Sequence, residues 1–255
     1  MIMTYKICFS PTGGTDKAAS IVANALSDAV TTVDLTDRQQ DFGTIEIDKD
    51  AMAVIAAPAY GGRVPSVAIE RLSQIRGNGC KAVLMAVYGN REFDDTLLEL
   101  QDAAEAAGFV PVAGIGAVAE HSLIRQFGAG RPDAEDEAEL LQFAKKIKAC
   151  VSRETFSLSI PGNRPYKVYG GVPAKPVTSD DCTQCGLCAE QCPVGAIPES
   201  DPSQTDVAAC ISCMRCLSIC PVDARALSPE IEAAFTEKLS AVCQGHKPNT
   251  LYLPQ

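Results

Sequence analysis

The sequence predicts an α/β protein with a doubly wound parallel sheet, followed by a small α+β domain rich in cysteine. Between Met3 and about Cys150, short apolar runs alternate with amphipathic stretches, which is typical of a parallel sheet covered by helices on both faces. Eight of the twelve cysteines then fall between Cys182 and Cys220. A chain of 255 residues has room for one mid-sized and one small domain, so we expect two unequal domains.

Five strands and four helices are predicted to alternate along the first part of the chain. The apolar runs place the strands at residues 4–10, 31–35, 51–57, 81–88 and 110–118. The amphipathic stretches between and after them place the helices at residues 15–29, 65–75, 92–107 and 134–152. Pro65 and Gly108 support two of these helix ends, since proline suits the first turn and glycine adopts the left-handed conformation that ends a helix.

Changes in composition predict four segments along the chain. We expect a first domain at residues 1–152, a linker at 153–178, the cysteine-rich domain at 179–228, and a helix with a polar tail at 229–255. The linker is rich in proline and glycine but contains Phe156, Tyr166 and Tyr169. These aromatic residues indicate that the linker packs against a domain instead of moving freely. The last helix is expected at residues 229–243.

The cysteines form an internal repeat with the spacing C-x2-C-x2-C-x3-C-P. The first copy contains Cys182, Cys185, Cys188 and Cys192, and the second, 28 positions later, contains Cys210, Cys213, Cys216 and Cys220. This spacing is typical of ligands for 4Fe-4S clusters. Zinc is the alternative for paired C-x2-C elements, but zinc would leave the third cysteine of each triplet unexplained. The pattern therefore favours iron–sulfur clusters.

Residues 179–228 resemble the bacterial two-cluster ferredoxins, with every expected cysteine present. The resemblance implies two 4Fe-4S clusters whose ligands cross between the two copies of the repeat. One cluster would then be held by Cys182, Cys185, Cys188 and Cys220, and the other by Cys210, Cys213, Cys216 and Cys192. Spacing alone does not exclude an uncrossed arrangement.

The segment from Ser10 to Thr15 reads Ser-Pro-Thr-Gly-Gly-Thr and joins the first predicted strand to the first helix. Its hydroxyls, with the free amides and dipole of the helix start, suit a phosphate group, and Gly13 and Gly14 allow close backbone approach. The loop lacks the Gly-Lys-Ser/Thr ending of nucleotide hydrolases and the Gly-x-Gly-x-x-Gly pattern of dinucleotide sites. A mononucleotide site is expected, the alternative being a polar strand-to-helix turn.

Residues 3–150 resemble the flavodoxin family. Ser10, Thr12, Gly13 and Thr15 match the phosphate loop of that family position by position. The resemblance implies a sheet in the order 2-1-3-4-5 with FMN at the carboxyl ends of its strands. The ring would lie against the loops after the third and fourth strands, which contain Ala59, Tyr60, Gly61, Gly62, Tyr88, Gly89 and Asn90. Tyr60 and Tyr88 are the candidates to border the ring, unless they are ordinary tyrosines at strand ends. The chain contains no tryptophan, the residue that stacks on the ring in many flavodoxins.

The two parts together resemble the flavodoxin–ferredoxin fusions of anaerobes. This resemblance implies electron transfer between FMN and the clusters within one chain. The alternative is a flavin-dependent reductase of a small acceptor, in which Arg63, Arg91 and His121 would contact the acceptor or move protons. The alternative is that Arg63 and Arg91 are solvated loop arginines and that His121 is a structural side chain, and the loops contain no evident acid–base pair.

Charge and hydropathy narrow the possible partners and location. A net charge of −10 argues against nucleic-acid binding, and it suits docking to redox partner proteins with basic patches. No apolar run approaches the ~20 residues that span a bilayer, and the first residues do not resemble a secretory signal. We therefore expect a cytoplasmic protein, and the sequence makes no prediction of its oligomeric state.

Overall fold

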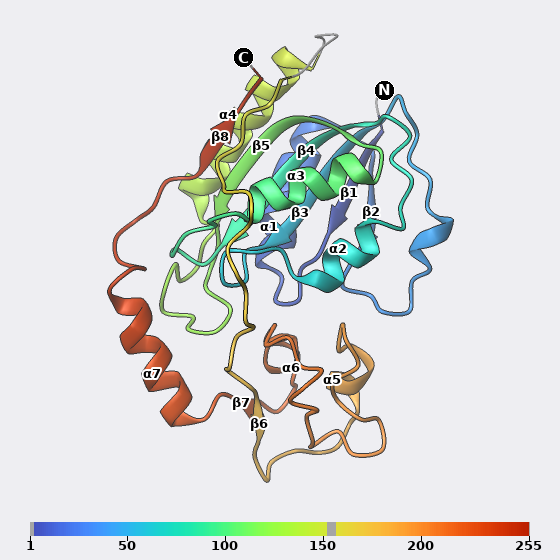
Figure 1. Cartoon of the computed structure of the whole chain (residues 1–255). Coiled ribbons are helices and arrows are strands. Elements are labelled where there is room, and N and C mark those ends of the chain that lie inside the picture. Colours follow the sequence, from blue (N-terminus) through green and yellow to red (C-terminus); the bar gives the residue numbers. More distant parts are fainter. Residues whose placement is uncertain (1–2, 152–156, 255) are drawn as a thin grey trace.

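The computed structural model describes residues 3–151 and 157–254, and its first domain is built on a parallel sheet. The parallel strands are β1 (Thr4–Cys8), β2 (Val30–Asp34), β3 (Met52–Pro58), β4 (Lys81–Tyr88) and β5 (Val110–Val118). They pair in the order β2-β1-β3-β4-β5 (Figure 1), which confirms the predicted order 2-1-3-4-5. The predicted bounds of β4 and β5 are those observed.

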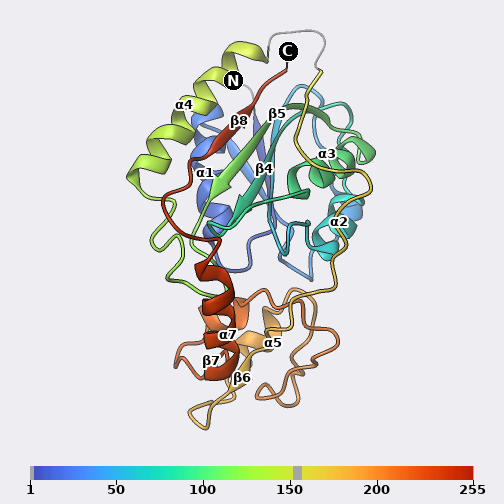
Figure 2. The same ribbon diagram turned by 60° about the vertical axis from the view of Figure 1, so that its left-hand side comes forward.

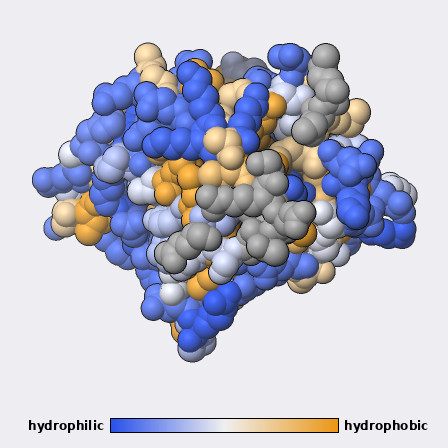
Figure 3. Space-filling model, turned by 90° about the horizontal axis from the view of Figure 1, so that it is seen from above, coloured by the Kyte–Doolittle hydropathy of each residue, from blue (hydrophilic) through white to orange (hydrophobic). Residues whose placement is uncertain are grey.

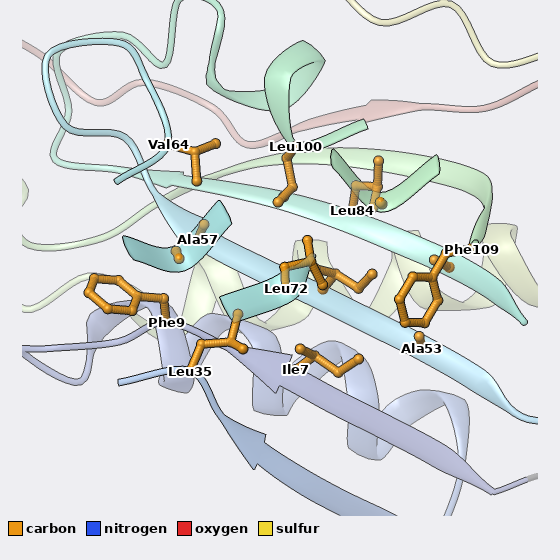
Figure 4. Close-up of a cluster of buried hydrophobic side chains, with 14 of the residues drawn as sticks. Ile7, Phe9, Leu35, Ala53, Ala57, Val64, Leu72, Leu84, Leu100 and Phe109 are labelled. Atoms are coloured by element: carbon orange, nitrogen blue, oxygen red, sulfur yellow. The ribbon is translucent and has the colours of Figure 1, made fainter. Parts of the chain in front are cut away.

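Helices cover both faces of this sheet, as a doubly wound fold requires. Helices α1 (Gly14–Leu26) and α4 (Ala134–Cys150) lie on one face, and α2 (Ser66–Leu72) and α3 (Thr96–Ala106) lie on the other (Figure 2). Leu72 and Leu100 pack between α2, α3 and the strands in one of the two main core clusters (Figure 4). A short 3-10 helix, η1 (Phe42–Thr44), lies between β2 and β3.

Helix α2 is shorter than the predicted residues 65–75 because the chain leaves it to form a bridge. The Arg76 amide donates to the Ile45 carbonyl at 3.1 Å, and the Ile47 amide donates to the Arg76 carbonyl at 2.9 Å. Helix α3 begins at Thr96 instead of residue 92. The carboxylate of Asp95, directly before it, accepts hydrogen bonds from the linker.

The C-terminal tail adds a sixth strand, which corrects the prediction of a five-stranded sheet. Strand β8 (Thr250–Tyr252) pairs antiparallel with β5 (Figure 1). Gly116 lies opposite Thr250, and a Cβ at Gly116 would come within 2.6 Å of the Thr250 hydroxyl oxygen. The tail can pass along β5 because this position has no side chain. The sequence could not show this, since the pairing joins residues far apart in the chain.

A buried ion pair fixes the tail to the first domain. Arg131 pairs with Asp136, and their side chains are 5% and 1% exposed. The amide nitrogen of Asn249 donates to Asp136 at 2.9 Å, while its oxygen accepts from the Val118 amide at 2.8 Å. Arg131 also donates to the carbonyl of Lys247 at 2.8 Å. The tail is thus fastened next to β8.

The cysteine-rich domain contains a two-stranded sheet and two short helices, related by the internal repeat. Its strands are β6 (Val177–Thr178) and β7 (Arg225–Ala226), and its helices are α5 (Leu187–Glu190) and α6 (Arg215–Ser218). The two helices begin 28 positions apart. Left-handed backbone conformations recur at the same offset, at Gln184, Gly186 and Gly195 and at Ser212, Met214 and Asp223. The cysteine repeat is therefore also a repeat of backbone conformation.

Two connections join this domain to the first one. The described part of the linker packs on the first domain, with Ile160 9% exposed beside Leu97 and Gly114, so the expected packing is seen for these residues. Phe156 lies outside the described residues. Helix α7 (Pro229–Ser240) ends three residues before the predicted residue 243, and the chain then returns to β5 (Figures 1 and 2).

The surface at the end that carries the N-terminus is mainly hydrophilic, with interrupted hydrophobic patches (Figure 3). No helix in the described ranges has the length and apolar character needed to cross a membrane.

Replacing Asp136 should destabilise the protein in a pH-dependent way. The hydrogen bonds from Arg131, Asp133 and Asn249 outweigh burial and lower the pKa of Asp136 to about 2. A depressed folded pKa contributes stability above the unfolded pKa of about 4, and this stability is lost as the pH falls through about 2. Asp136→Asn should therefore lower the free energy of unfolding by about 3 kcal/mol at neutral pH.

Urea unfolding followed by circular dichroism at several pH values measures this effect. The difference between wild type and Asp136→Asn should shrink as the pH falls from 4 towards 2. Asp28→Asn, at an exposed position, is the control and should change little at any pH. A constant difference across this range would contradict the role of the ionised carboxylate.

Candidate cofactor sites

A cavity of about 480 Å³ lies at the carboxyl edge of the parallel strands. Its walls come from the loops after β1, β3, β4 and β5, from residues 167–173 of the linker, and from α7. Of the residues predicted to bind a cofactor, those lining it are Thr12, Gly14, Thr15, Ala59, Tyr60, Gly61, Tyr88 and Gly89. This is the place where open α/β sheets bind ligands, and the volume is typical of small-molecule sites.

The loop after β1 presents two free helix amides to the cavity. Gly13 precedes α1 with φ 89° and has no side chain with which to cap the helix. In the described part of the chain, the amides of Gly14 and Thr15 have no hydrogen-bond partner. Thr12 is exposed beside them. These donors fit a phosphate group, because the helix dipole and free amides favour an anion at this position.

Ser10 does not line this cavity. Its hydroxyl oxygen accepts the amide of Asp16 at 2.9 Å, and its own amide donates to Thr36 at 2.8 Å. Ser10 therefore shapes the loop, and it lines a neighbouring cavity together with Gly13.

The loop after β3 is a tight turn with two left-handed glycines. The Tyr60 amide donates to the Arg63 carbonyl at 2.9 Å, and Gly61 and Gly62 have φ values of 61° and 89°. Tyr60 and Gly61 face the cavity. Gly62 does not line it; it lies against Asp94, whose side chain a Cβ on Gly62 would meet.

Residues of the loop after β4 contact either the cavity or the C-terminal tail. Tyr88 is only 6% exposed, with its ring centroid 5.5 Å from that of Phe93. Gly89 lies against His121, since a Cβ placed on Gly89 would be 2.5 Å from the Cδ2 atom of His121. Asn90 is turned away from the cavity, and its amide donates to the Cys243 carbonyl at 2.6 Å. Asn90 thus holds the tail.

Arg63, Arg91 and His121 differ in what they offer the cavity. Arg63 pairs with Glu99 at 2.6 Å outside the cavity. Arg91 lines it but pairs with Asp94. The Nδ1 atom of His121 accepts the amide of Leu123 at 3.2 Å. Burial, and then the charge of Arg91, lower the pKa of His121 to about 4, so the imidazole is neutral at neutral pH.

Four of the predicted cluster ligands surround one small cavity in the cysteine-rich domain. They are Cys192, Cys210, Cys213 and Cys216, and Pro193, Ile197 and Met214 lie around the same cavity. Thus Cys192 lies with the second triplet. In the other set, Cys185 is exposed, while Cys182, Cys188 and Cys220 are half-buried. Across the described ranges, no three histidine, cysteine or acidic side chains are grouped tightly enough for a single metal ion.

Backbone amides already point to the sulfur atoms of both copies of the repeat. The Ala196 amide donates to the Cys192 sulfur at 3.2 Å, and the Ala224 amide donates to the Cys220 sulfur at 3.3 Å. Burial, with a smaller contribution from the neighbouring cysteines, raises the pKa values of Cys213 and Cys216 to about 12. Bound iron would offset this cost, since a coordinated thiol loses its proton. The donor set fits an iron–sulfur cluster.

The two sites adjoin each other. Ser212, directly before the predicted cluster ligand Cys213, lines the same cavity as Tyr60. Burial, and to a smaller extent the charges of Cys213 and Tyr169, raise the pKa of Tyr60 well above its ordinary value.

Three arginines join the two domains around this point. Arg215 donates to the carbonyl of Pro11 at 3.1 Å. Arg71 donates to the Leu35 and Pro193 carbonyls, both at 2.6 Å, and Arg38 donates to the Ala189 carbonyl at 3.4 Å. The sequence analysis did not identify these arginines. Arg215 stands at the position that Leu187 has in the first copy of the repeat. This difference between the copies was the sequence signal that could have identified Arg215.

Comparisons with known proteins separate the two parts of the chain. Residues 181–225 match the family described as the 4Fe-4S dicluster domain. Ferredoxin-2 of Chlorobaculum tepidum is 36% identical over 52 residues, which are 18% of this chain and 84% of that protein.

Solved structures resemble the first part of the chain. A flavodoxin of Streptococcus pneumoniae is 22% identical, with 58% of this chain and 98% of that chain covered and a TM-score of 0.41. A short-chain flavodoxin associated with a PDU bacterial microcompartment is 21% identical, with 60% and 100% covered and a TM-score of 0.43. The fold of the first domain follows from its own sheet order. The chain therefore belongs, through its C-terminal domain, to the 4Fe-4S dicluster ferredoxins, and joins that domain to an N-terminal domain of the flavodoxin-like fold.

Proposed function

We propose that the chain binds FMN in the 480 Å³ cavity and transfers electrons within one molecule between FMN and its two 4Fe-4S clusters. The dicluster domain implies the two clusters. The observation that carries the proposal is that the second cysteine triplet adjoins the cavity: Ser212, directly before Cys213, lines it, and Arg215 donates to the carbonyl of Pro11 in its wall at 3.1 Å. Electron transfer needs the centres to be close, and the three interdomain arginines keep these two regions together.

The residues around the cavity fit a mononucleotide. The amides of Gly14 and Thr15 and the hydroxyl of Thr12 would hold the phosphate, assisted by the dipole of α1. Tyr60 and Gly89 would border the ring from the loops after β3 and β4. When bound, FMN exchanges one or two electrons, whereas each cluster exchanges one.

The state of His121 argues against the alternative function, a flavin-dependent reductase. A neutral imidazole with a pKa of about 4 is a poor proton donor at neutral pH. Arg63 is engaged by Glu99 and does not line the cavity. Arg91 lines the cavity but pairs with Asp94. The three residues therefore offer an acceptor neither an unpaired charge nor a proton donor at neutral pH, and we favour electron transfer. The external partners would be redox proteins with basic surfaces, because the chain has a net charge of −10.

Cofactor content and intramolecular kinetics test the proposal. Protein purified without oxygen should contain FMN together with iron and sulfide for two clusters. After rapid reduction of the clusters, the flavin should be reduced at a rate independent of protein concentration, because both centres belong to one chain. Stopped-flow absorbance measures this rate. A rate that rises in proportion to protein concentration would contradict transfer within the chain.

Thr12→Val should weaken FMN binding and leave the clusters unchanged. The substitution keeps the size of the side chain but removes a donor to a charged phosphate, which should raise the Kd by about ten- to a hundredfold. Fluorescence titration of the flavin-free protein measures the Kd. Thr31→Val, at an exposed position in β2, is the matched control. Equal Kd values for both variants would place the phosphate elsewhere.

Cys192→Ala should remove the cluster held by the second triplet, because Cys192 shares a cavity with Cys210, Cys213 and Cys216. Alkylation under native conditions, followed by peptide mass spectrometry, identifies the freed cysteines. We expect Cys210, Cys213 and Cys216 to become reactive while Cys182, Cys185 and Cys188 stay protected. Cys220→Ala, its counterpart in the repeat, should give the opposite pattern. Loss of the first triplet's cluster in Cys192→Ala would favour uncrossed ligation.

A further inference from the structure

Residues 167–173 of the linker form a strap that closes one side of the cavity. The strap is fastened to the first domain at its start, where the Lys167 amide donates to Asp95 at 2.6 Å and its carbonyl accepts from Arg63 at 2.7 Å. At its other end, the Ser212 hydroxyl donates to the Val172 carbonyl at 2.7 Å. Because both domains hold it, the strap has a defined position over the cavity.

Tyr169 lies in the middle of the strap and faces the loop after β3. A Cβ placed on Gly61 would come within 2.7 Å of Tyr169 Cε2 and 2.8 Å of Cδ2, so the ring rests directly on the backbone of Gly61. Tyr60, which precedes Gly61 in sequence, lines the same cavity as Tyr169. The ring is half-buried and lines the cavity.

The other aromatic side chains near the cavity are engaged elsewhere. Phe235 of α7 lines the cavity but packs against the apolar cluster that includes Met214 and Leu239. Tyr88 is 6% exposed and packs on Phe93. Tyr166 lies below the guanidinium of Arg63, 4.8 Å from it, and does not line the cavity. Tyr169 therefore joins Tyr60 as an aromatic ring at the cavity wall, and it comes from a segment outside the flavodoxin-like domain.

We infer that Tyr169 is the aromatic cover of the bound flavin, supplied by the interdomain linker, so that flavin binding depends on the strap as well as on the first domain. This inference rests on the proposed binding of FMN. A flat aromatic ring gains stability from an offset or tilted aromatic neighbour, and the same contact removes water from one of its faces. The strap thus provides a ring at the cavity of a chain that has no tryptophan.

The test compares Tyr169→Ala, Tyr169→Phe and the control Tyr166→Ala in the full chain with its clusters in place. Titration of each flavin-free protein with FMN gives the Kd and the fluorescence of the bound flavin, which an adjacent aromatic ring quenches. Tyr169→Ala should raise the Kd on the order of tenfold and increase the bound-flavin fluorescence. Tyr169→Phe keeps the ring and should behave like wild type, as should Tyr166→Ala.

Two results would contradict the role of Tyr169 without contradicting the binding of FMN. One is wild-type Kd and fluorescence in Tyr169→Ala, and the other is a Tyr166→Ala variant that matches Tyr169→Ala, because the effect would then come from loosening the linker. Unchanged cluster absorbance and thermal unfolding in each variant show that the fold is retained. A wild-type chain that does not bind FMN would instead contradict the proposed function itself.

Discussion

The C-terminal domain is attached to the sheet domain at both of its ends, and the relation between the two cofactor sites depends on this constraint. The linker runs along the first domain before the cysteine-rich domain, and the tail returns to β5 after it (Figure 1). A domain attached by one flexible linker explores many orientations, whereas two attachments leave far fewer. The buried Arg131–Asp136 pair and Asn249 secure the second attachment. The predicted cluster ligands are thereby held near the carboxyl edge of the sheet.

The contacts between the domains are made mainly by arginine side chains and backbone carbonyls. Arg38, Arg71 and Arg215 donate to carbonyls of the opposite domain. Arginine suits such contacts because its planar group has several donors with fixed directions. In a chain with a net charge of −10, cations at the junction also reduce repulsion between the two parts. Arg215 lies between Cys213 and Cys216 in sequence and contacts the loop after β1, so one side chain connects the neighbourhoods of both sites.

The internal repeat is kept more strictly in backbone conformation than in residue type. Gly186 and Gly195 of the first copy have left-handed conformations that cost glycine little. Their counterparts, Met214 and Asp223, have the same conformations although they carry side chains. Such conformations cost on the order of 1 kcal/mol and persist where the surroundings require them. Met214 is 2% exposed within the cluster of apolar residues around α7, so packing offsets this cost in the second copy.

The sequence by itself determined the features that depend on neighbouring residues. Periodicity predicted the five parallel strands, and the spacing of the cysteines predicted a dicluster domain, because both signals are local. The phosphate loop from Ser10 to Thr15 was also visible, although Ser10 shapes the loop instead of lining the main cavity. Only the tertiary structure decided the pairing of β8 with β5, the use of Asn90 to hold the tail, and the place of Tyr169 at the cavity. Each of these joins residues far apart in the chain, and such contacts leave no local pattern because they arise only when the chain folds.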